Sequence, residues 1–239
     1  MTTRSFAPVF ILSFVLITMA GASAFGQALT MITFRPTYHG SPIRFDAEHY
    51  QGTNGSRVTF SMLKFYICDL RVRTIDGASV KIGGHHLLDL TDDETSSISI
   101  TMPNARIASF DFTVGVDSVL NEQGPQEGAL DPRNGMYWTW STGYVFFKLE
   151  GTVESASQPK RVYEIHVGGY KAPYRNMIDV RCAVPATFSA TSSSCTIDVE
   201  LAKLLDGDAA FDLVKRPSVT TAQQAVDVAP RIGEMFRVR

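Results

Sequence analysis

The sequence predicts an all-β fold, either an antiparallel β-sandwich or an open barrel, with long loops and short helical C-terminal elements. Short runs of alternating apolar and polar residues recur along most of the chain, and Gly, Pro, Asn and Asp separate them. Helical propensity is concentrated after residue 200. Many short strands with few helices are typical of two packed sheets or of one sheet that closes on itself.

The first residues predict a secretory signal peptide over residues 1–24. Arg4 supplies a positive charge, residues 9–19 form an apolar run too short to span a bilayer, and small residues precede the proposed cleavage point. We expect cleavage after Ala24, with Ala28 as the second choice. The mature chain would then be periplasmic or secreted.

Residues 25–239 are expected to form a single domain, because β-sandwiches reach this size as one unit. No later segment is a long uncharged apolar run, so no membrane span is predicted in the mature chain. The net charge is −2 and the basic residues are scattered. This pattern gives no electrostatic footprint for nucleic acid.

The first half of the mature chain predicts strands, and within one of them the apolar residues shift from one set of alternate positions to the other. A strand over 29–34 is expected to end at Pro36. Residues 57–75 alternate in two phases that switch near Met62, which predicts a bulge or bend. Residues 80–90 form a further strand that Gly83 and Gly84 interrupt.

The second half continues the same pattern and ends differently. Strands are expected at 98–102, 107–116, 144–149, 161–167, 178–182 and 195–201. Residues 201–205 and 221–235 have helical propensity, with a break at Pro230. We expect these helical pieces to cover a sheet edge or an open end.

The stretch 112–151 joins two strands through one long polar loop. The loop is dense in Gly, Asn, Asp and Pro, and both tryptophans follow it as Trp138-Thr139-Trp140. Ordered loops of this length are usually functional. The two tryptophans are expected on one face of an extended segment, where the simplest role for them is to anchor the core.

Oxygen-bearing side chains in this loop permit two interpretations. They are Asp117, Asn121, Glu127, Asp131 and Asn134. Calcium requires six to eight oxygen ligands and could be held by such a set, with Asp117 and Asp131 as the main candidates. The alternative is that these side chains cap turns through nearby backbone amides.

The segment GVDSVLNEQGPQEGALDPRNGMYWTWSTGYVFFKLEG, residues 115–151, resembles the central signature of the MbnP-like family of exported bacterial proteins. The segments FRPTYHG, MLKFYICDLRV, HHLLDL and YEIHVGG are similar to further family segments in order and spacing. The resemblance covers most of the mature chain and fades after about residue 200.

This resemblance implies a copper-binding protein of metal acquisition or handling. It selects His86 and His166 as copper ligands, with His39 as a third ligand or a supporting group. It further implies a partner dihaem peroxidase of the MauG type that oxidises a tryptophan to kynurenine, here Trp138 or Trp140, and an outer-membrane receptor. The alternative for each histidine is a hydrogen-bonded structural residue, which we expect for His49 and His85.

The three cysteines would meet an oxidising compartment after export. Cys182 and Cys195 are expected to point into the core from neighbouring strands and to form a disulfide. Cys68 is expected to be a buried free thiol.

An enzyme is not predicted, because the chain has no GxSxG or HExxH motif and Ser118 has no identifiable base. The sequence therefore favours a non-catalytic copper-binding protein. The alternative is an extracytoplasmic recognition or scaffold module without a metal, in which the signature only builds the fold.

Overall fold

The structure is a computed structural model that describes residues 27–103, 105–139, 141–186, 194–207 and 210–239. Strands dominate it and short helices lie near the C-terminus, which confirms the predicted fold class. The predicted signal peptide and Trp140 lie outside the described residues. Within these ranges no helix is long and apolar enough to cross a bilayer.

A five-stranded sheet is organised around the first strand, β1. Its members are β1 (Gln27–Tyr38), β2 (Ser41–Pro42), β7 (Ser97–Pro103), β13 (Ser194–Glu200) and β15 (Phe236–Val238). The expected end of β1 at Pro36 is wrong: Pro36 pairs with Val199, and its carbonyl accepts a hydrogen bond from Ile43 N. β1 and β13 are parallel, as are β11 and β14, so the sheets are mixed and not wholly antiparallel.

The second sheet has ten strands and uses the long strand β4 as its spine. Its members are β3 (Tyr50–Gln51), β4 (Arg57–Thr74), β5 (Ser79–Lys81), β6 (His86–Asp89), β8 (Ile107–Val114), β9 (Tyr137–Thr139), β10 (Gly143–Ser155), β11 (Gln158–Gly168), β12 (Ile178–Ala183) and β14 (Ser218–Val219). Lys64 of β4 pairs with Lys148 of β10 on one side and with Asp89 of β6 on the other. Strands β10 and β6 therefore flank opposite sides of β4.

The predicted change of phase in β4 is confirmed. Met62 pairs with Glu150, whereas Phe60 pairs with Gly151, so Ser61 is an extra residue between two matched pairs. This bulge allows Phe60 and Leu63 to face the same core although they are three positions apart.

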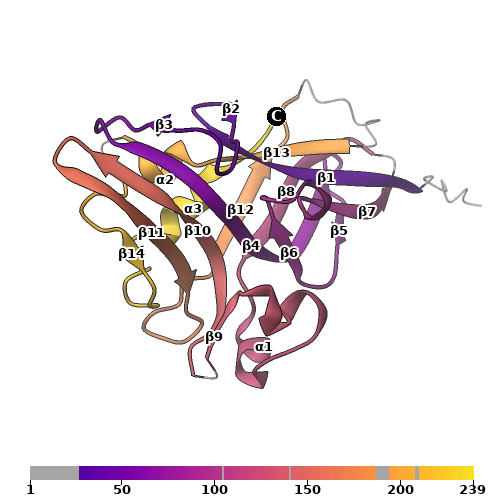
Figure 1. Ribbon diagram of the computed structural model, residues 1–239. Helices are drawn as coiled ribbons and strands as arrows, with labels where there is room; N and C mark the ends of the chain where they lie inside the picture. Colours follow the sequence, from indigo (N-terminus) through magenta and orange to yellow (C-terminus); the bar gives the residue numbers. More distant parts are fainter. Residues whose placement is uncertain (1–26, 104, 140, 187–193, 208–209) are drawn as a thin grey trace, which may run out of the picture.

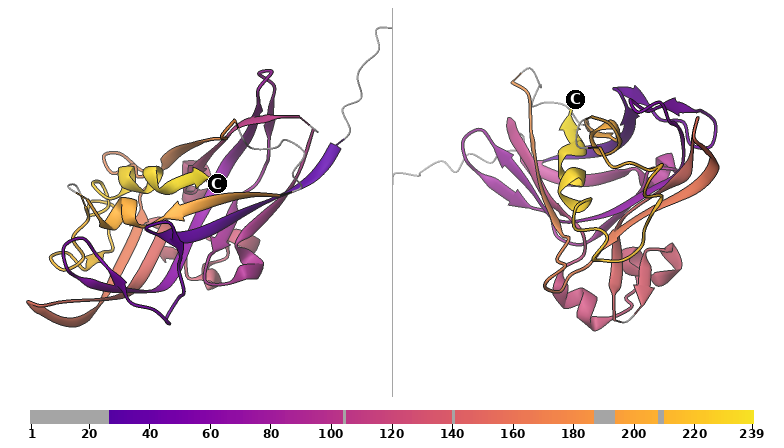
Figure 2. Two further views of the ribbon diagram at one scale, coloured as in Figure 1. Left: turned by 90° about the horizontal axis from the view of Figure 1, so that it is seen from above. Right: turned by 90° about the vertical axis from the view of Figure 1, so that its left-hand side faces the viewer.

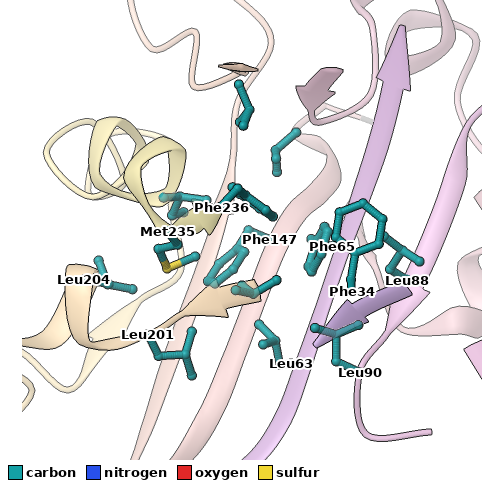
Figure 3. Close-up of a cluster of buried hydrophobic side chains, with 14 of the residues drawn as sticks. Phe34, Leu63, Phe65, Leu88, Leu90, Phe147, Leu201, Leu204, Met235 and Phe236 are labelled. Carbon is teal, nitrogen blue, oxygen red and sulfur yellow. The ribbon is translucent and has the colours of Figure 1, made fainter. Parts of the chain in front are cut away.

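The two sheets curl into a half-barrel around the main hydrophobic core (Figure 2). The C-terminal elements α2 (Ala202–Leu205), α3 (Ala229–Ile232) and η4 (Gly233–Met235) lie within its concavity, and Met235 and Phe236 reach the aromatic side chains of the sheets (Figure 3). Pro230 does not interrupt a helix as expected, because a helix begins there. Pro230 lies in the first turn of α3, where its missing N–H removes no helical hydrogen bond.

Candidate functional site

The signature loop lies on the outer face of the ten-stranded sheet, away from the half-barrel's concavity (Figures 1 and 2). It contains α1 (Ser118–Gln123), η2 (Gly128–Leu130), η3 (Pro132–Asn134) and β9. Asp117 caps α1 by accepting a hydrogen bond from Leu120 N at 3.0 Å, and Asp131 caps η3 by accepting one from Arg133 N at 2.8 Å. The loop is thus ordered by its own side chains.

A second hydrophobic cluster joins this loop to the sheet. Its buried members are Tyr66, Val116, Leu130, Met136, Tyr144, Val145, Phe146 and Tyr170. The rings of Tyr66 and Tyr144 meet edge to face at 5.9 Å. Their hydroxyls donate to the carbonyls of Ala129 and Leu130, at 2.9 and 2.8 Å. The cluster therefore combines apolar burial with directed hydrogen bonds to the loop.

Asn121 is the polar centre of this cluster and is 1% exposed. Its side-chain NH₂ group donates to the carbonyls of Val116 and Asp117, and its Oδ1 accepts from Tyr144 N at 2.9 Å. Gly143 makes this approach possible, because a Cβ at that position would lie 2.1 Å from the Asn121 oxygen. Asn121 thus connects the start of the loop to the strand that follows it.

His166 lies on the same outer face as the loop. It pairs with Lys148 in the sheet, while its neighbours Ile165 and Val167 face the main core. Its Nε2 lies 2.7 Å from Glu150 Oε1, and Lys148 Nζ is 3.3 Å from the same oxygen. Glu150 therefore fixes the orientation of an imidazole whose side chain is only 14% exposed.

Trp138, the one tryptophan among the described residues, lies against Gly168 of the strand that carries this histidine. A Cβ added to Gly168, two residues beyond His166 on the same face, would lie 2.7 Å from the Trp138 ring. Trp138 is half-buried at the edge of the second cluster, so it is a peripheral contact and not the main core anchor that was expected.

His86 points in the opposite direction. It pairs with Ile67, and Leu88 on the same face belongs to the main core. Its Nε2 is buried without a hydrogen-bond partner, and burial lowers the pKa of the ring, assisted by the neighbouring His85 and opposed by a hydrogen bond to the Gly83 backbone. His86 therefore favours the neutral form.

The structure does not bring His86 and His166 together. The β6, β4, β10 and β11 strands lie in that order, so the two residues are three strand spacings apart, roughly 14 Å across the sheet. Their side chains also leave opposite faces. The expectation that they converge beside the loop is wrong. β4 alternates without a bulge from Lys64, which lies in line with Lys148 and His166, to Ile67, which pairs with His86, so the two histidines leave opposite faces.

His39 lies in neither place. It follows β1 at the turn before β2, on the far side of the molecule from α1 (Figure 1). Its Nε2 is 3.0 Å from Asp206 Oδ2, while Glu200 accepts hydrogen bonds from the His39 and Gly40 amides at 2.8 and 2.7 Å. This environment matches the structural alternative for His39, as a residue that fastens a turn.

His85 was expected to be structural, yet it is the histidine that contacts the signature loop directly. Its Nε2 is buried and lies 3.1 Å from Asp117 Oδ2, although the geometry is that of a charge contact and not of a hydrogen bond. Alternation predicts that His85 and His86 leave opposite faces of the strand. Once His86 is assigned to the core, this alternation places His85 on the face that carries the loop. No such pattern in the sequence marks Glu150 and Lys148 as neighbours of His166.

The calcium interpretation gains no support from the contacts of the loop. Asp117 and Asp131 act as caps, Asp131 also binds the Arg133 guanidinium at 2.6 Å, and Asn134 donates to the carbonyls of Gly128 and Ala129. These are the capping roles of the alternative interpretation. Among the described residues, no group of three or more His, Cys, Asp or Glu side chains is arranged to hold a metal ion.

The cysteines are all free and buried in the structure. The predicted disulfide between Cys182 and Cys195 is therefore not confirmed, whereas the prediction that Cys68 is a buried free thiol is confirmed. Cys182 and Cys195 both face the main core, but from different sheets and not from neighbouring strands. Burial, and the charge of Cys195 after it, raises the pKa of Cys182 to about 12. Burial alone raises the pKa of Cys195 to about 11.

Comparison with known proteins identifies the family to which the signature belongs. A family model described as MbnP matches residues 27–223. Among solved structures, MbnP from Methylosinus trichosporium is similar to this chain with a TM-score of 0.60 and 16% identity, over 89% of this chain and 98% of that one. At this identity the structural match establishes the fold alone. A comparison with curated proteins found no match.

Proposed function

Because the chain belongs to the MbnP family, we propose that it is an exported, copper-related protein whose copper-binding group on the outer face is His166. The observation that carries this proposal is the position of the ring: Glu150 holds one nitrogen at 2.7 Å, and Trp138 packs against Gly168 beside it. Membership of the family suggests a role connected with copper. The residues of the outer face suggest where such a role would be located.

The donor chemistry at His166 fits a metal ligand. A ligating histidine commonly directs its second ring nitrogen to a carboxylate, which fixes the ring and increases its basicity. Glu150 occupies that supporting position at Nε2, which leaves Nδ1 as the donor. Copper, when bound, would supply a redox-active centre at this nitrogen.

The three histidines implied by the resemblance do not fit one ion together. His86 faces the main core and His39 fastens a turn on the other side of the molecule. We therefore assign copper contact to His166 and structural roles to His39 and His86.

Trp138 is our candidate for the oxidised aromatic residue. Its half-buried position at the edge of the loop leaves part of the indole accessible from outside. We propose that a dihaem peroxidase of the MauG type acts on it, and that an outer-membrane receptor is a second partner. Both partners are exported classes of protein, in agreement with the secretory segment that the sequence predicts.

Copper loading tests this assignment. Elemental analysis of the loaded protein is expected to show less bound copper in His166→Ala, and unchanged copper in His86→Ala and in the exposed control His49→Ala. The ligand loss should lower affinity by about tenfold or more, as loss of a ligand or its supporting group does in other metal sites. Full copper content in His166→Ala would remove the assigned site.

A recognition or scaffold module without a metal is the second candidate. It is favoured by the use of signature residues within the loop itself: Asn121 and Asp131 bond the backbone, and Tyr144 fills the second cluster. Mass spectrometry of the exported protein distinguishes the two. Unmodified Trp138 together with no bound copper would favour the module.

A further inference from the structure

A polar cleft lies at the opposite end of the β10–β11 pair from Trp138. Its lining residues come from the tip of that hairpin, the turn before β4 and the segment that precedes β14. Its volume is about 630 Å³, which is within the range of small-molecule sites. Side chains that can donate hydrogen bonds line it: Asn54, Ser155, Ser157, Gln158, Arg161 and Lys215.

Arg161 is the unusual residue of this cleft. It pairs with Val153 of β10, a main-core residue, so its side chain leaves the inner face of the sheet at the rim. Its Nε is buried without a hydrogen-bond partner. Within the described part of the chain, no carboxylate lies within ion-pair distance of it. Burial of a guanidinium N–H without an acceptor is unfavourable, so an oxygen acceptor bound there would stabilise it.

The charges around Arg161 favour an anion. Arg161 and Lys215 are the two cations of the cleft, and Asp212 is its one carboxylate. Asp212 is already engaged, because its Oδ1 accepts from Val214 N and Lys215 N, at 2.9 and 3.1 Å, and its Oδ2 lies 3.1 Å from Lys215 Nζ. Asn54 Oδ1 accepts from Ser56 N, which leaves the Asn54 NH₂ group as a donor. Donors are therefore in excess over free acceptors.

We propose that this cleft binds a small oxoanion, a carboxylate or phosphate group, with Arg161 as its principal contact and Lys215 as the second charge. The planar fork of an arginine matches two oxygens of either group. The cleft opens at the inner rim of the sheet, whereas His166 lies on the outer face, so the proposal is independent of copper binding.

Calorimetric titration of the mature protein at low ionic strength tests the proposal, with inorganic phosphate in one series and succinate in the other. Saturable binding of either anion is expected, and the tighter of the two identifies the class of ligand. Arg161→Gln should weaken binding about tenfold, and Lys215→Gln by a smaller factor. Arg161→Lys keeps the charge without the fork and should fall between wild type and Arg161→Gln.

Arg181→Gln is the matched control, since Arg181 is an exposed arginine paired with Asp111 on the outer face. Binding in this variant should be unchanged. Lack of saturable binding to both anions, or an equal loss in Arg181→Gln, would overturn the proposal. If the Arg161 variants fail to fold by circular dichroism, the titration of Lys215→Gln against wild type decides the result: an unchanged affinity overturns it and a weaker one supports it.

Discussion

The inner and outer faces of the ten-stranded sheet are both covered, but by different kinds of contact. On the inner face, aromatic rings from both sheets meet edge to face, as Phe34 and Phe65 do at 5.8 Å and Phe112 and Phe236 do at 5.2 Å. On the outer face, a smaller cluster depends on Asn121 and on tyrosine hydroxyls that bond loop carbonyls. Apolar burial is non-directional, whereas a buried hydrogen bond requires each partner in place.

This difference predicts separate failure of the two regions. Loss of a main-core contact should destabilise the whole domain, because both sheets and the C-terminal elements share that core. Loss of a bond in the outer cluster should release the loop first, because the loop contacts the sheet only locally.

Truncation of Phe65 should have the largest effect. Phe65 is fully buried and meets the rings of Phe34, Phe147 and Phe236. Phe65→Ala should reduce the free energy of unfolding by about 3–5 kcal/mol, measured by urea denaturation. The control Val162→Ala, at a 65% exposed position, should change it by less than about 0.5 kcal/mol. A small loss in Phe65→Ala would show that the half-barrel does not depend on this core.

Asn121→Ala should have a smaller and more local effect. The substitution leaves the Tyr144 N–H without its acceptor in a buried position, which costs about 1–3 kcal/mol. Hydrogen exchange should accelerate in the loop between Asp117 and Met136, while the β4 amides stay protected. Val119→Ala is the control on the same helix, at a 64% exposed position. Equal acceleration in β4 and in the loop would contradict the separation of the two regions.

The inner face was predictable from the sequence and the outer face was not. Alternation identified most strands, and the switch near Met62 located the bulge at Ser61, because a period of two marks the buried face directly. The outer cluster depends on contacts such as Asn121 with Tyr144, which are far apart in the chain and have no period. Parallel pairing of β1 with β13 was missed for the same reason.

The histidines illustrate this limit within the candidate site. Resemblance to the family predicts His166 as a copper ligand but gives no indication of Glu150, which holds its ring. It also grouped His86 with His166, although the pairing through β4 places them on opposite faces. Residue types and spacing cannot show whether two residues on strands three positions apart in a sheet share a face. That information comes from the strand order and the register.

The pH dependence of stability should reveal the burial of His86, and this is the smallest of the three expected effects. Burial lowers the pKa of His86 in the folded protein below the value of about 6.5 expected in the unfolded chain. Between these two values the unfolded chain binds more protons, so the free energy of unfolding should fall as the pH is lowered through about 6.5. Replacement by a residue that does not titrate should remove this part of the acid-induced loss.

Urea denaturation of wild type, His86→Gln and the exposed control His49→Gln at about pH 7.5 and about pH 5.5 measures that difference. His86→Gln should lose less stability on acidification than wild type, and His49→Gln should follow wild type. An identical acid dependence in His86→Gln and wild type would mean that the His86 ring is not desolvated on the inner face. The contrast with the Glu150-bound ring of His166 would then no longer hold, because it depends on burial of one ring and a carboxylate partner for the other.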